Sequence, residues 1–288
     1  MTQPLTLSCG AMRCELAPAL GGAIAGLWHN DVPVLRSTPS GQLRSVRESA
    51  SYPLVPFSNR IGHGQLHWAG VRYPLAHNFA PEPHAIHGVG WQRPWLVQQT
   101  KPDYALLSLQ HEPDDGWPFA FHCAQSFQLG PDRLTLSLQA TNRSGMAVPM
   151  GLGWHPYFVK RASAHLRFAA SGRWEMGADK LPTVRQPLAG LDTDCATLDV
   201  DHCFDGWVDA LYLRDAVFET TVRSSLSHLV VFTNPQRDFV AIEPVSHLNN
   251  ALQLAERLLC PAQALGLQIL QSGESLSAHM AIGVAPVR

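Results

Sequence analysis

Glu243 ends an apolar run, and this placement could make its carboxyl group a base. The segment Phe239–Pro244 is apolar up to Glu243. If the segment is a β-strand, Glu243 shares a face with Phe239 and Ala241, because side chains alternate along a strand. On an interior face, loss of water would raise the pKa of the carboxyl and increase its basicity. On an exterior face, Glu243 would be a solvated charge, and the pattern alone leaves both possibilities open.

His155 stands in an aromatic segment that could supply an acid. Gly151–Phe158 contains His155 together with Trp154, Tyr157 and Phe158. An imidazole that faces a cavity and titrates near pH 7 can exchange protons with a ligand. The alternative is a histidine that packs in the core beneath the aromatic rings.

Two polar residues, Asn59 and Arg60, lie within a segment rich in proline and glycine. The Arg60 guanidinium offers a planar fork of donors, and the Asn59 amide offers both a donor and an acceptor. Such a pair can bind hydroxyl or carboxylate oxygens. The alternative is an ordinary surface turn.

A second histidine motif, His84-Ala85-Ile86-His87, permits two interpretations. Imidazole is a common zinc ligand, so His84 and His87 could belong to a zinc enzyme. No nearby third ligand has a recognised spacing, and the other histidines of this region are scattered at His63, His67 and His77. Because Trp91 follows, the segment also fits a sugar pocket, in which an aromatic face covers the ring and imidazole meets hydroxyls.

Several familiar catalytic motifs are absent from the sequence. The chain has no GxGxxG, GxxxxGK[ST], HExxH or GxSxG pattern. These patterns bind dinucleotides, bind nucleotide phosphates, hold zinc, or present a nucleophilic serine. We therefore expect side-chain chemistry without a cofactor or a metal.

The elements that position these residues are predicted to be strands. Apolar and polar residues alternate over Phe119–Leu129, Leu134–Thr141 and Leu276–Val284, which is the period of a half-buried strand. Turn residues separate the runs, as at Gly130-Pro131-Asp132 and Asn234-Pro235. Glycine and proline each occur 22 times. Many short strands with such punctuation predict an all-β sandwich or barrel.

One modest helix is predicted over Asn250–Leu258. Leu252, Ala255 and Leu259 could share its apolar face, and Asn250 could cap its N-terminus. No change of composition or linker marks a domain boundary. Residues 1–288 are therefore expected to form one large β domain.

Composition restricts the partners and the compartment. The net charge is −2, so there is no excess of basic side chains to neutralise a phosphate backbone, and nucleic acid is not an expected partner. No segment has the roughly 20 apolar residues that span a bilayer. The six cysteines form no CxxC pair or regular framework. Free thiols in the reducing cytoplasm, away from membranes, are the expected state.

Taken together and in order, five segments resemble the aldose 1-epimerase, or galactose mutarotase-like, family. They are Asn59-Arg60-Ile61, Ile86-His87-Gly88, Gly153–Phe158, Leu198–Phe204 and Ile242-Glu243-Pro244. The resemblance extends from about Leu16 to the C-terminus. It implies a large antiparallel β-sandwich, the family's supersandwich, which agrees with the strand pattern. It also implies that a small sugar is the partner.

The resemblance assigns roles to individual residues. Glu243 matches the base that takes the proton of the anomeric hydroxyl, and His155 matches the acid that protonates the ring oxygen. The positions that hold the sugar hydroxyls or assist at the ring oxygen are Asn59, Arg60, His87, Tyr157 and Asp201. Within the acidic stretch, Asp201 fits the family pattern better than Asp199 or Asp205. Only a small pKa shift is then expected at His155.

The substrate is less constrained than the reaction. Galactose-type members carry a glutamine on the strand before the base, whereas Val230 stands nearest that place here. A related activity is hexose-6-phosphate 1-epimerase, which needs cations around the phosphate; candidates are Arg44, Arg47, Arg72 and Arg93. The plain His155-Pro156-Tyr157-Phe158 element favours an unphosphorylated aldose. A non-catalytic carbohydrate-binding protein on the same fold is the other alternative.

Overall fold

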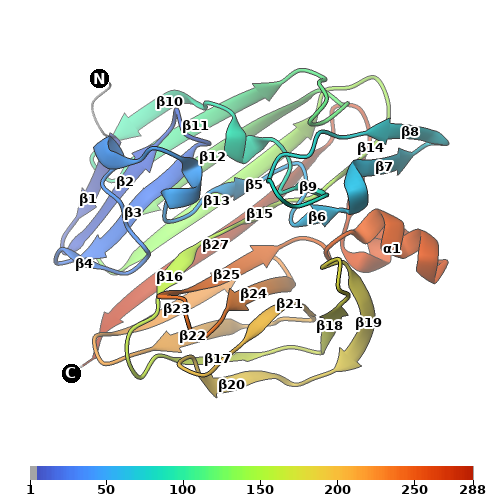
Figure 1. The fold of residues 1–288 in the computed structure, drawn as a ribbon. Helices are drawn as coiled ribbons and strands as arrows, with labels where there is room; N and C mark the ends of the chain where they lie inside the picture. The colour runs from blue at the N-terminus through green and yellow to red at the C-terminus, as the bar shows by residue number, and fades with distance from the viewer. Residues whose placement is uncertain (1–4, 288) are drawn as a thin grey trace.

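The computed structural model describes residues 5–287, and antiparallel β-sheet dominates it (Figure 1). The all-β prediction is therefore confirmed. Two large sheets form most of the molecule, and four smaller sheets complete it.

The first large sheet has nine strands and runs from β10 at the upper edge of Figure 1 to β20 at its lower edge. Its strands, in order across the sheet, are β10 (Leu96–Lys101), β11 (Tyr104–His111), β12 (Phe121–Leu129), β13 (Arg133–Asn142), β27 (Ser275–Pro286), β23 (Phe218–Ser224), β22 (Ala210–Arg214), β17 (His165–Ala169) and β20 (Gly190–Asp194). The last long strand, β27, lies between β13 and β23 and joins the two halves of this sheet.

The second large sheet carries the strand that contains Glu243. Its strands, in order, are β19 (Pro182–Pro187), β18 (Gly172–Met176), β21 (Val200–Asp205), β24 (His228–Thr233), β25 (Phe239–Val245), β15 (Gly153–Trp154) and β5 (Pro53–Leu54), and β16 (Tyr157–Val159) also pairs with β25. Strand β25 thus lies between β24 on one side and both β15 and β16 on the other.

The remaining elements are short and lie around these sheets. The smaller sheets pair β1 (Leu5–Cys9), β2 (Met12–Ala17), β3 (Ala23–His29) and β4 (Val32–Pro33); β14 (Val148–Met150) with β26 (Gln268–Leu270); β6 (Arg60–Ile61) with β9 (Ala85–Ile86); and β7 (Gln65–Trp68) with β8 (Val71–Pro74). The helices are α1 (Ala251–Leu258) and the short 3-10 turns η1 (Ser40–Gln42), η2 (Val46–Glu48), η3 (Gly62–Gly64), η4 (Gly90–Gln92) and η5 (Ala262–Leu265).

The alternating runs of the sequence form strands of the nine-stranded sheet. In β12 and β13, side chains alternate between buried and partly exposed. The predicted strands over Phe119–Leu129, Leu134–Thr141 and Leu276–Val284 correspond to β12, β13 and β27 and are confirmed. The inward apolar side chains of all three strands join the main core. Burial of these side chains is the main force that fixes the register, since a slip of one residue would expose them.

Strand β25 is buried on both faces, and this determines the environment of Glu243. Val240 and Ile242 point into the main core. Glu243 points to the opposite face, where its neighbours Val230 and Val245 belong to a second apolar cluster. The face of Glu243 is therefore neither the main core nor open solvent, and only 2% of the residue is exposed.

The predicted helix corresponds to α1, but its cap differs from the prediction. Asn250 occupies the position before the helix, with a φ of 55°, and its side chain makes no capping hydrogen bond. Its Oδ1 instead accepts from the backbone N–H of Gly62 at 3.0 Å. The side chain thus ties the start of α1 to the loop beside β6.

The predicted apolar face of α1 is partly wrong. Ala255 is buried, but Leu252 is only partly buried and Leu259 is 93% exposed, because the helix has ended before it. The buried side chains are Ala251, Leu254 and Ala255. Within residues 5–287, no helix combines the length and apolar character needed to cross a membrane.

Candidate active site

Strand pairing brings His155 and Glu243 opposite one another. Gly153 of β15 pairs with Val245, and Tyr157 of β16 pairs with Ala241. His155 lies midway between Gly153 and Tyr157. Glu243 lies midway between Val245 and Ala241 on the facing strand. The backbone N–H of His155 does not pair with β25, because it donates to the Tyr52 carbonyl at 3.0 Å.

The two side chains are in direct contact. His155 Nε2 lies 3.1 Å from Glu243 Oε1. The Tyr157 hydroxyl lies 3.4 Å from the same nitrogen, and the Tyr157 ring stacks on the imidazole. The other polar atoms of the pair, His155 Nδ1 and Glu243 Oε2, are buried and have no hydrogen-bond partner among residues 5–287. The contact between Nε2 and Oε1 is therefore the polar interaction that joins the two side chains.

Burial moves the two pKa values in opposite directions. Burial and the nearby charge of Asp201 raise the pKa of Glu243 well above its ordinary value, although Arg60 acts against this. Burial, with a smaller contribution from Arg36, lowers the pKa of His155 to about 3. The expectation of only a small shift at His155 is wrong, because the sequence does not reveal how completely the imidazole is removed from water.

The raised pKa of Glu243 and the lowered pKa of His155 favour a pair in which both side chains are uncharged and one proton can move between them. A protonated Glu243 beside a neutral His155 has the same number of protons as a carboxylate beside an imidazolium. The two forms differ only by a proton transfer between Oε1 and Nε2. The pair can therefore supply an acid and a base together without exchanging a proton with solvent.

A cavity of about 340 Å³ opens onto this pair and is lined by every residue to which the family resemblance assigned a role. Its lining comprises Arg36, Arg47, Tyr52, Asn59, Arg60, Phe79, Glu82, Ile86, His87, His155, Tyr157, Lys180, Asp201, Val230, Phe232, Arg237, Phe239 and Glu243. Aromatic faces, hydrogen-bond donors and carboxylates thus line one space, as a sugar site requires.

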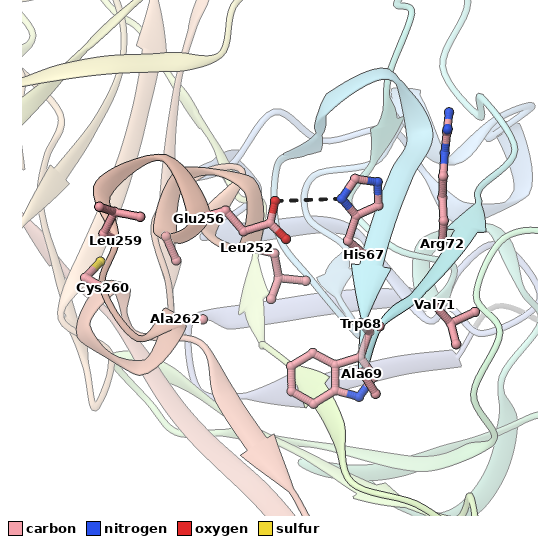
Figure 2. Close-up of a pocket in the computed structure, with 12 residues that line it drawn as sticks. His67, Trp68, Ala69, Val71, Arg72, Leu252, Glu256, Leu259, Cys260 and Ala262 are labelled. Carbon is pink, nitrogen blue, oxygen red and sulfur yellow. Dashed lines mark ion pairs between the residues drawn. The ribbon is translucent and has the colours of Figure 1, made fainter.

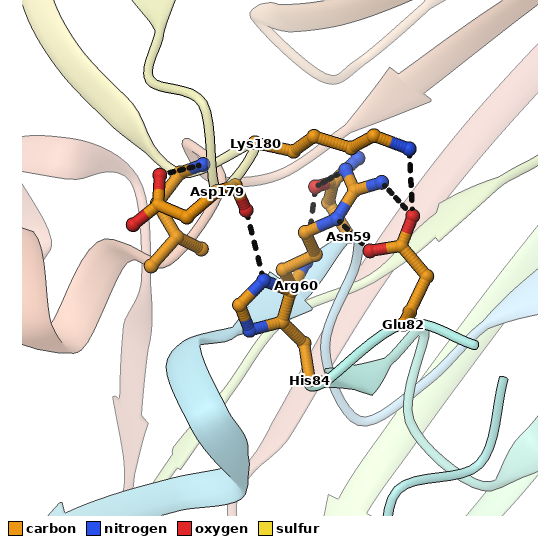
Figure 3. Close-up of polar contacts among 7 residues, drawn as sticks. Asn59, Arg60, Glu82, His84, Asp179 and Lys180 are labelled. Atoms are coloured by element: carbon orange, nitrogen blue, oxygen red, sulfur yellow. Dashed lines mark hydrogen bonds and ion pairs between the residues drawn. The ribbon is translucent and has the colours of Figure 1, made fainter. Parts of the chain in front are cut away.

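Arg60 is buried and held by a bidentate ion pair (Figure 3). Its Nε and Nη2 donate to the two carboxylate oxygens of Glu82 at 3.1 and 3.0 Å. Its Nη1 donates to Asn59 Oδ1 at 3.2 Å, and Lys180 Nζ also reaches Glu82. Burial opposes ionisation, but the bonds from Arg60 and Lys180 lower the pKa of Glu82 to about 2. The alternative of a solvated surface turn is therefore wrong for Asn59 and Arg60.

His87 is fixed as a neutral donor. Its Nδ1 accepts from the backbone N–H of Asn59 at 3.1 Å. Burial, with the neighbouring His155 and Arg60, lowers its pKa well below the ordinary value. In a neutral imidazole whose Nδ1 accepts, the proton is on Nε2. His87 therefore presents an N–H group to a ligand in the cavity.

The same tautomer argues against a metal at this point. His87, His155 and Glu243 have potential ligand atoms within 4.8 Å of one another. The free nitrogen of His87 carries a proton, however, and a metal ligand must offer a lone pair there. The trio fits proton transfer and hydrogen bonding better than metal binding.

His84 does not join His87 in a common site. Its Nδ1 accepts from the His63 N–H at 2.9 Å, and its Nε2 lies 2.9 Å from the Asp179 carbonyl oxygen (Figure 3). Both ring nitrogens are thus occupied. The zinc hypothesis built on His84 and His87 therefore has no geometric support, and His84 instead anchors the loop before β19.

Asp201 and Val230 lie on the same face of the sheet as Glu243. Asp201 pairs with Phe232, and Val230 pairs directly with Glu243. Asp201 lines the cavity, whereas Asp205 binds Arg185 and the Trp174 indole N–H. Val230 presents an apolar surface beside Glu243, so that position offers a ligand no donor.

Sequence reasoning missed several residues of the cavity. Tyr52 is the most central of them, because its hydroxyl lies 3.1 Å from that of Tyr157 and its ring contacts both His87 and His155. It comes from the proline-rich segment before Asn59, which gave no periodic signal. The other missed residues are Arg36, Phe79, Glu82, Ile86, Lys180, Phe232, Arg237 and Phe239.

A second, wider surface hollow of about 650 Å³ lies between the β7–β8 hairpin and α1 (Figure 2). It is lined largely by apolar side chains such as Val71, Leu252 and Leu259, with a 3.7 Å contact between His67 and Glu256. His67 and Arg72, which the sequence offered as a metal ligand and a phosphate-binding cation, line it, but none of the residues assigned to the acid–base pair or to the sugar hydroxyls does. The chemistry of the molecule is therefore concentrated in the smaller cavity.

Comparison with known families identifies the chain. Residues 5–283 match the aldose 1-epimerase family model. The chain belongs to the aldose 1-epimerase family. The uncharacterized protein YphB of Escherichia coli K12 is 32% identical over 169 residues, which cover 59% of this chain. The matched part spans 56% of the length of YphB.

Solved structures of this family share the fold. A galactose mutarotase-like protein from Clostridium acetobutylicum superimposes with a TM-score of 0.84 at 18% identity, covering 98% of this chain and 95% of its own. The GalM/aldose epimerase homologue from C. elegans gives 0.83 at 16% identity and full coverage of both chains. The galactose mutarotase-like fold expected from the sequence is therefore confirmed.

Proposed function

We propose that the protein is an aldose 1-epimerase, which interconverts the α and β anomers of an aldose without a cofactor. Glu243 acts as the base and His155 as the acid. The observation that carries this proposal is the 3.1 Å contact between His155 Nε2 and Glu243 Oε1, two buried side chains that line the cavity. Membership of the family supports the same reaction type.

The reaction needs two proton transfers at neighbouring atoms. Opening the ring removes the proton of the anomeric hydroxyl and adds one to the ring oxygen. Both oxygens are bonded to the same carbon, so an acid and a base in contact can reach them together. A proton shift from Glu243 to His155 creates the ion pair that starts the opening. Ring opening returns the pair to its neutral form, and the free aldehyde then rotates about the C1–C2 bond. In closure Glu243 returns a proton to the anomeric oxygen and His155 takes the proton of the attacking hydroxyl, which restores the ion pair and completes the exchange.

The surrounding residues orient the sugar in this proposal. Asn59, Arg60 and His87 offer donors to hydroxyl oxygens, and Asp201 offers an acceptor. Tyr157 stacks on His155 and holds it beside the ring oxygen. Proton transfer by each member of the pair is expected to contribute about 10²–10⁴-fold to the rate.

Anomer exchange measured by NMR tests the proposal. Wild-type protein should accelerate equilibration of at least one aldose, and Glu243→Gln should reduce the enzymatic rate by about 10²-fold or more. Glu256→Gln is the matched control, because Glu256 is exposed and lies outside the cavity. Equal rates for wild type and Glu243→Gln would show that Glu243 is not the base. Sugar binding without acceleration would instead indicate a carbohydrate-binding protein.

A further inference from the structure

The candidate cavity is strongly cationic, although the whole chain has a net charge of −2. Its acidic side chains are Glu82, Asp201 and Glu243. Its cationic side chains are Arg36, Arg47, Arg60, Lys180 and Arg237. Since burial favours the neutral form of Glu243, the cations outnumber the charges available to balance them.

Three of these cations have no acidic partner. Glu82 pairs with both Arg60 and Lys180. Across residues 5–287, Arg36, Arg47 and Arg237 make no ion pair with a carboxylate. Arg36 is partly buried, whereas Arg47 and Arg237 are exposed to solvent, and all three guanidinium groups can meet an anionic ligand in the cavity.

Arg36 is the most constrained of the three. Its Nη2 donates to the carbonyls of Arg47 and Ser49 at 2.7 and 2.9 Å, and its guanidinium lies 3.9 Å from the centre of the Tyr157 ring. Its Nε is buried and has no hydrogen-bond partner within the described part of the chain. The two carbonyl acceptors and the Tyr157 ring thus hold the guanidinium in one orientation at the cavity wall.

Arg47 and Arg237 are also supported by aromatic rings. The Arg237 guanidinium lies 5.6 Å from the centre of the Phe239 ring, and Arg36 lies 5.1 Å from the same ring. Arg47 lies 3.6 Å from the centre of the Phe79 ring. Stacking orders a guanidinium while leaving its N–H edge free for an oxyanion. Each of the three guanidinium groups is therefore ordered by an aromatic ring and lines the same cavity.

We propose that the sugar substrate is an aldose bearing an oxyanion group away from its anomeric carbon, and that Arg36, Arg47 and Arg237 bind this group. The inference rests on the proposed epimerase function and names its substrate class. A phosphate ester and a sugar carboxylate share the required chemistry. Of the cations expected from the sequence to accompany a phosphate, Arg47 lines the cavity, whereas Arg44, Arg72 and Arg93 do not.

Anomer exchange of three substrates tests the inference: glucose, glucose 6-phosphate and glucuronate. Wild type should turn over at least one anionic sugar with a kcat/KM about tenfold above that of glucose. The double variant Arg47→Gln/Arg237→Gln should lower the anionic-to-neutral ratio by about tenfold, mainly through KM. The matched control Arg44→Gln/Arg72→Gln removes two exposed arginines outside the cavity and should leave the ratio unchanged. The phosphate and carboxylate arms identify which oxyanion is preferred.

The outcomes distinguish failure of the anion site from failure of the proposed epimerase function. A wild type that prefers glucose, or a ratio that the Arg47/Arg237 double variant does not change, overturns the anion site and leaves the epimerase function intact. If neither these three sugars nor any other aldose tested is accelerated, the epimerase function fails, and binding of inorganic phosphate measured by calorimetry decides the anion site. Phosphate binding that is lost in the double variant, but not in the control, supports the site. Equal binding by all three proteins overturns it.

Discussion

Replacing Glu82 by glutamine tests how strongly the ion pairs at the cavity edge stabilise the fold. Its carboxylate binds Arg60 through two bonds and Lys180 through a third (Figure 3). The pKa of Glu82 falls from 4.5 to about 2, and a shift of this size corresponds to roughly 3 kcal/mol. Water screens part of this, since Lys180 is half exposed, so we expect Glu82→Gln to lower the free energy of unfolding by about 2 kcal/mol.

The effect has a defined dependence on pH. A carboxyl whose pKa is depressed in the folded state stabilises the fold fully above its unfolded pKa, and this contribution is lost as pH falls toward the folded pKa. The difference between wild type and Glu82→Gln should therefore be constant from pH 7 to about 5 and should shrink as pH falls below 4.5 toward 2.

Urea unfolding at several pH values measures this difference. Glu256→Gln is the control, because Glu256 is exposed and its contact with His67 is 3.7 Å long. Exposed pairs contribute only about 0–1 kcal/mol, so the control should resemble wild type. A Glu82→Gln protein as stable as the control at pH 7 would refute the argument that this ion-pair cluster is strongly stabilising.

Three further predictions concern stability and metals. Burial lowers the pKa of His247 to about 4, so protonation of this side chain opposes folding, and its contribution should lower the free energy of unfolding by roughly 3 kcal/mol between pH 6.5 and 4. Urea titrations should show this decrease for wild type and for the exposed control His279→Gln, but not for His247→Gln. Gln125→Leu removes the acceptor of the Trp154 indole N–H, which should cost about 1–3 kcal/mol in thermal or chemical unfolding and lower the rate of anomer exchange. Because His87 carries its proton on Nε2, treatment with a chelator should leave that rate unchanged, and a loss restored by added zinc would contradict the assigned tautomer.

Local patterns in the sequence predicted the strands well. Along β12 and β13 the alternation of apolar residues follows the two environments of a half-buried strand, so the period is visible in the sequence. Strand β25 is buried on both faces and has no such alternation. Its sequence could therefore not show whether Glu243 faces the core or solvent, because the answer depends on which loops cover the second face.

The site could be predicted only in part, because its members meet through tertiary contacts. The positions of Glu243 and His155 came from the family resemblance, and their contact comes from the register between β25 and its neighbours. Tyr52, Arg36 and Arg237 carry no motif and reach the cavity from loops or short strands. Their pairing, burial and charge balance depend on residues far apart in the chain, and no local pattern encodes these properties.

A double-mutant cycle on Glu243 and His155 tests the central claim most directly. Anomer exchange would be measured by NMR for wild type, Glu243→Gln, His155→Gln and the double variant on the best substrate. If the two residues share one proton and act as a unit, each single change should remove about 10²–10⁴-fold of the rate, and the double change should remove little more than the worse single change. Losses that multiply, or a loss confined to one residue, would contradict the account.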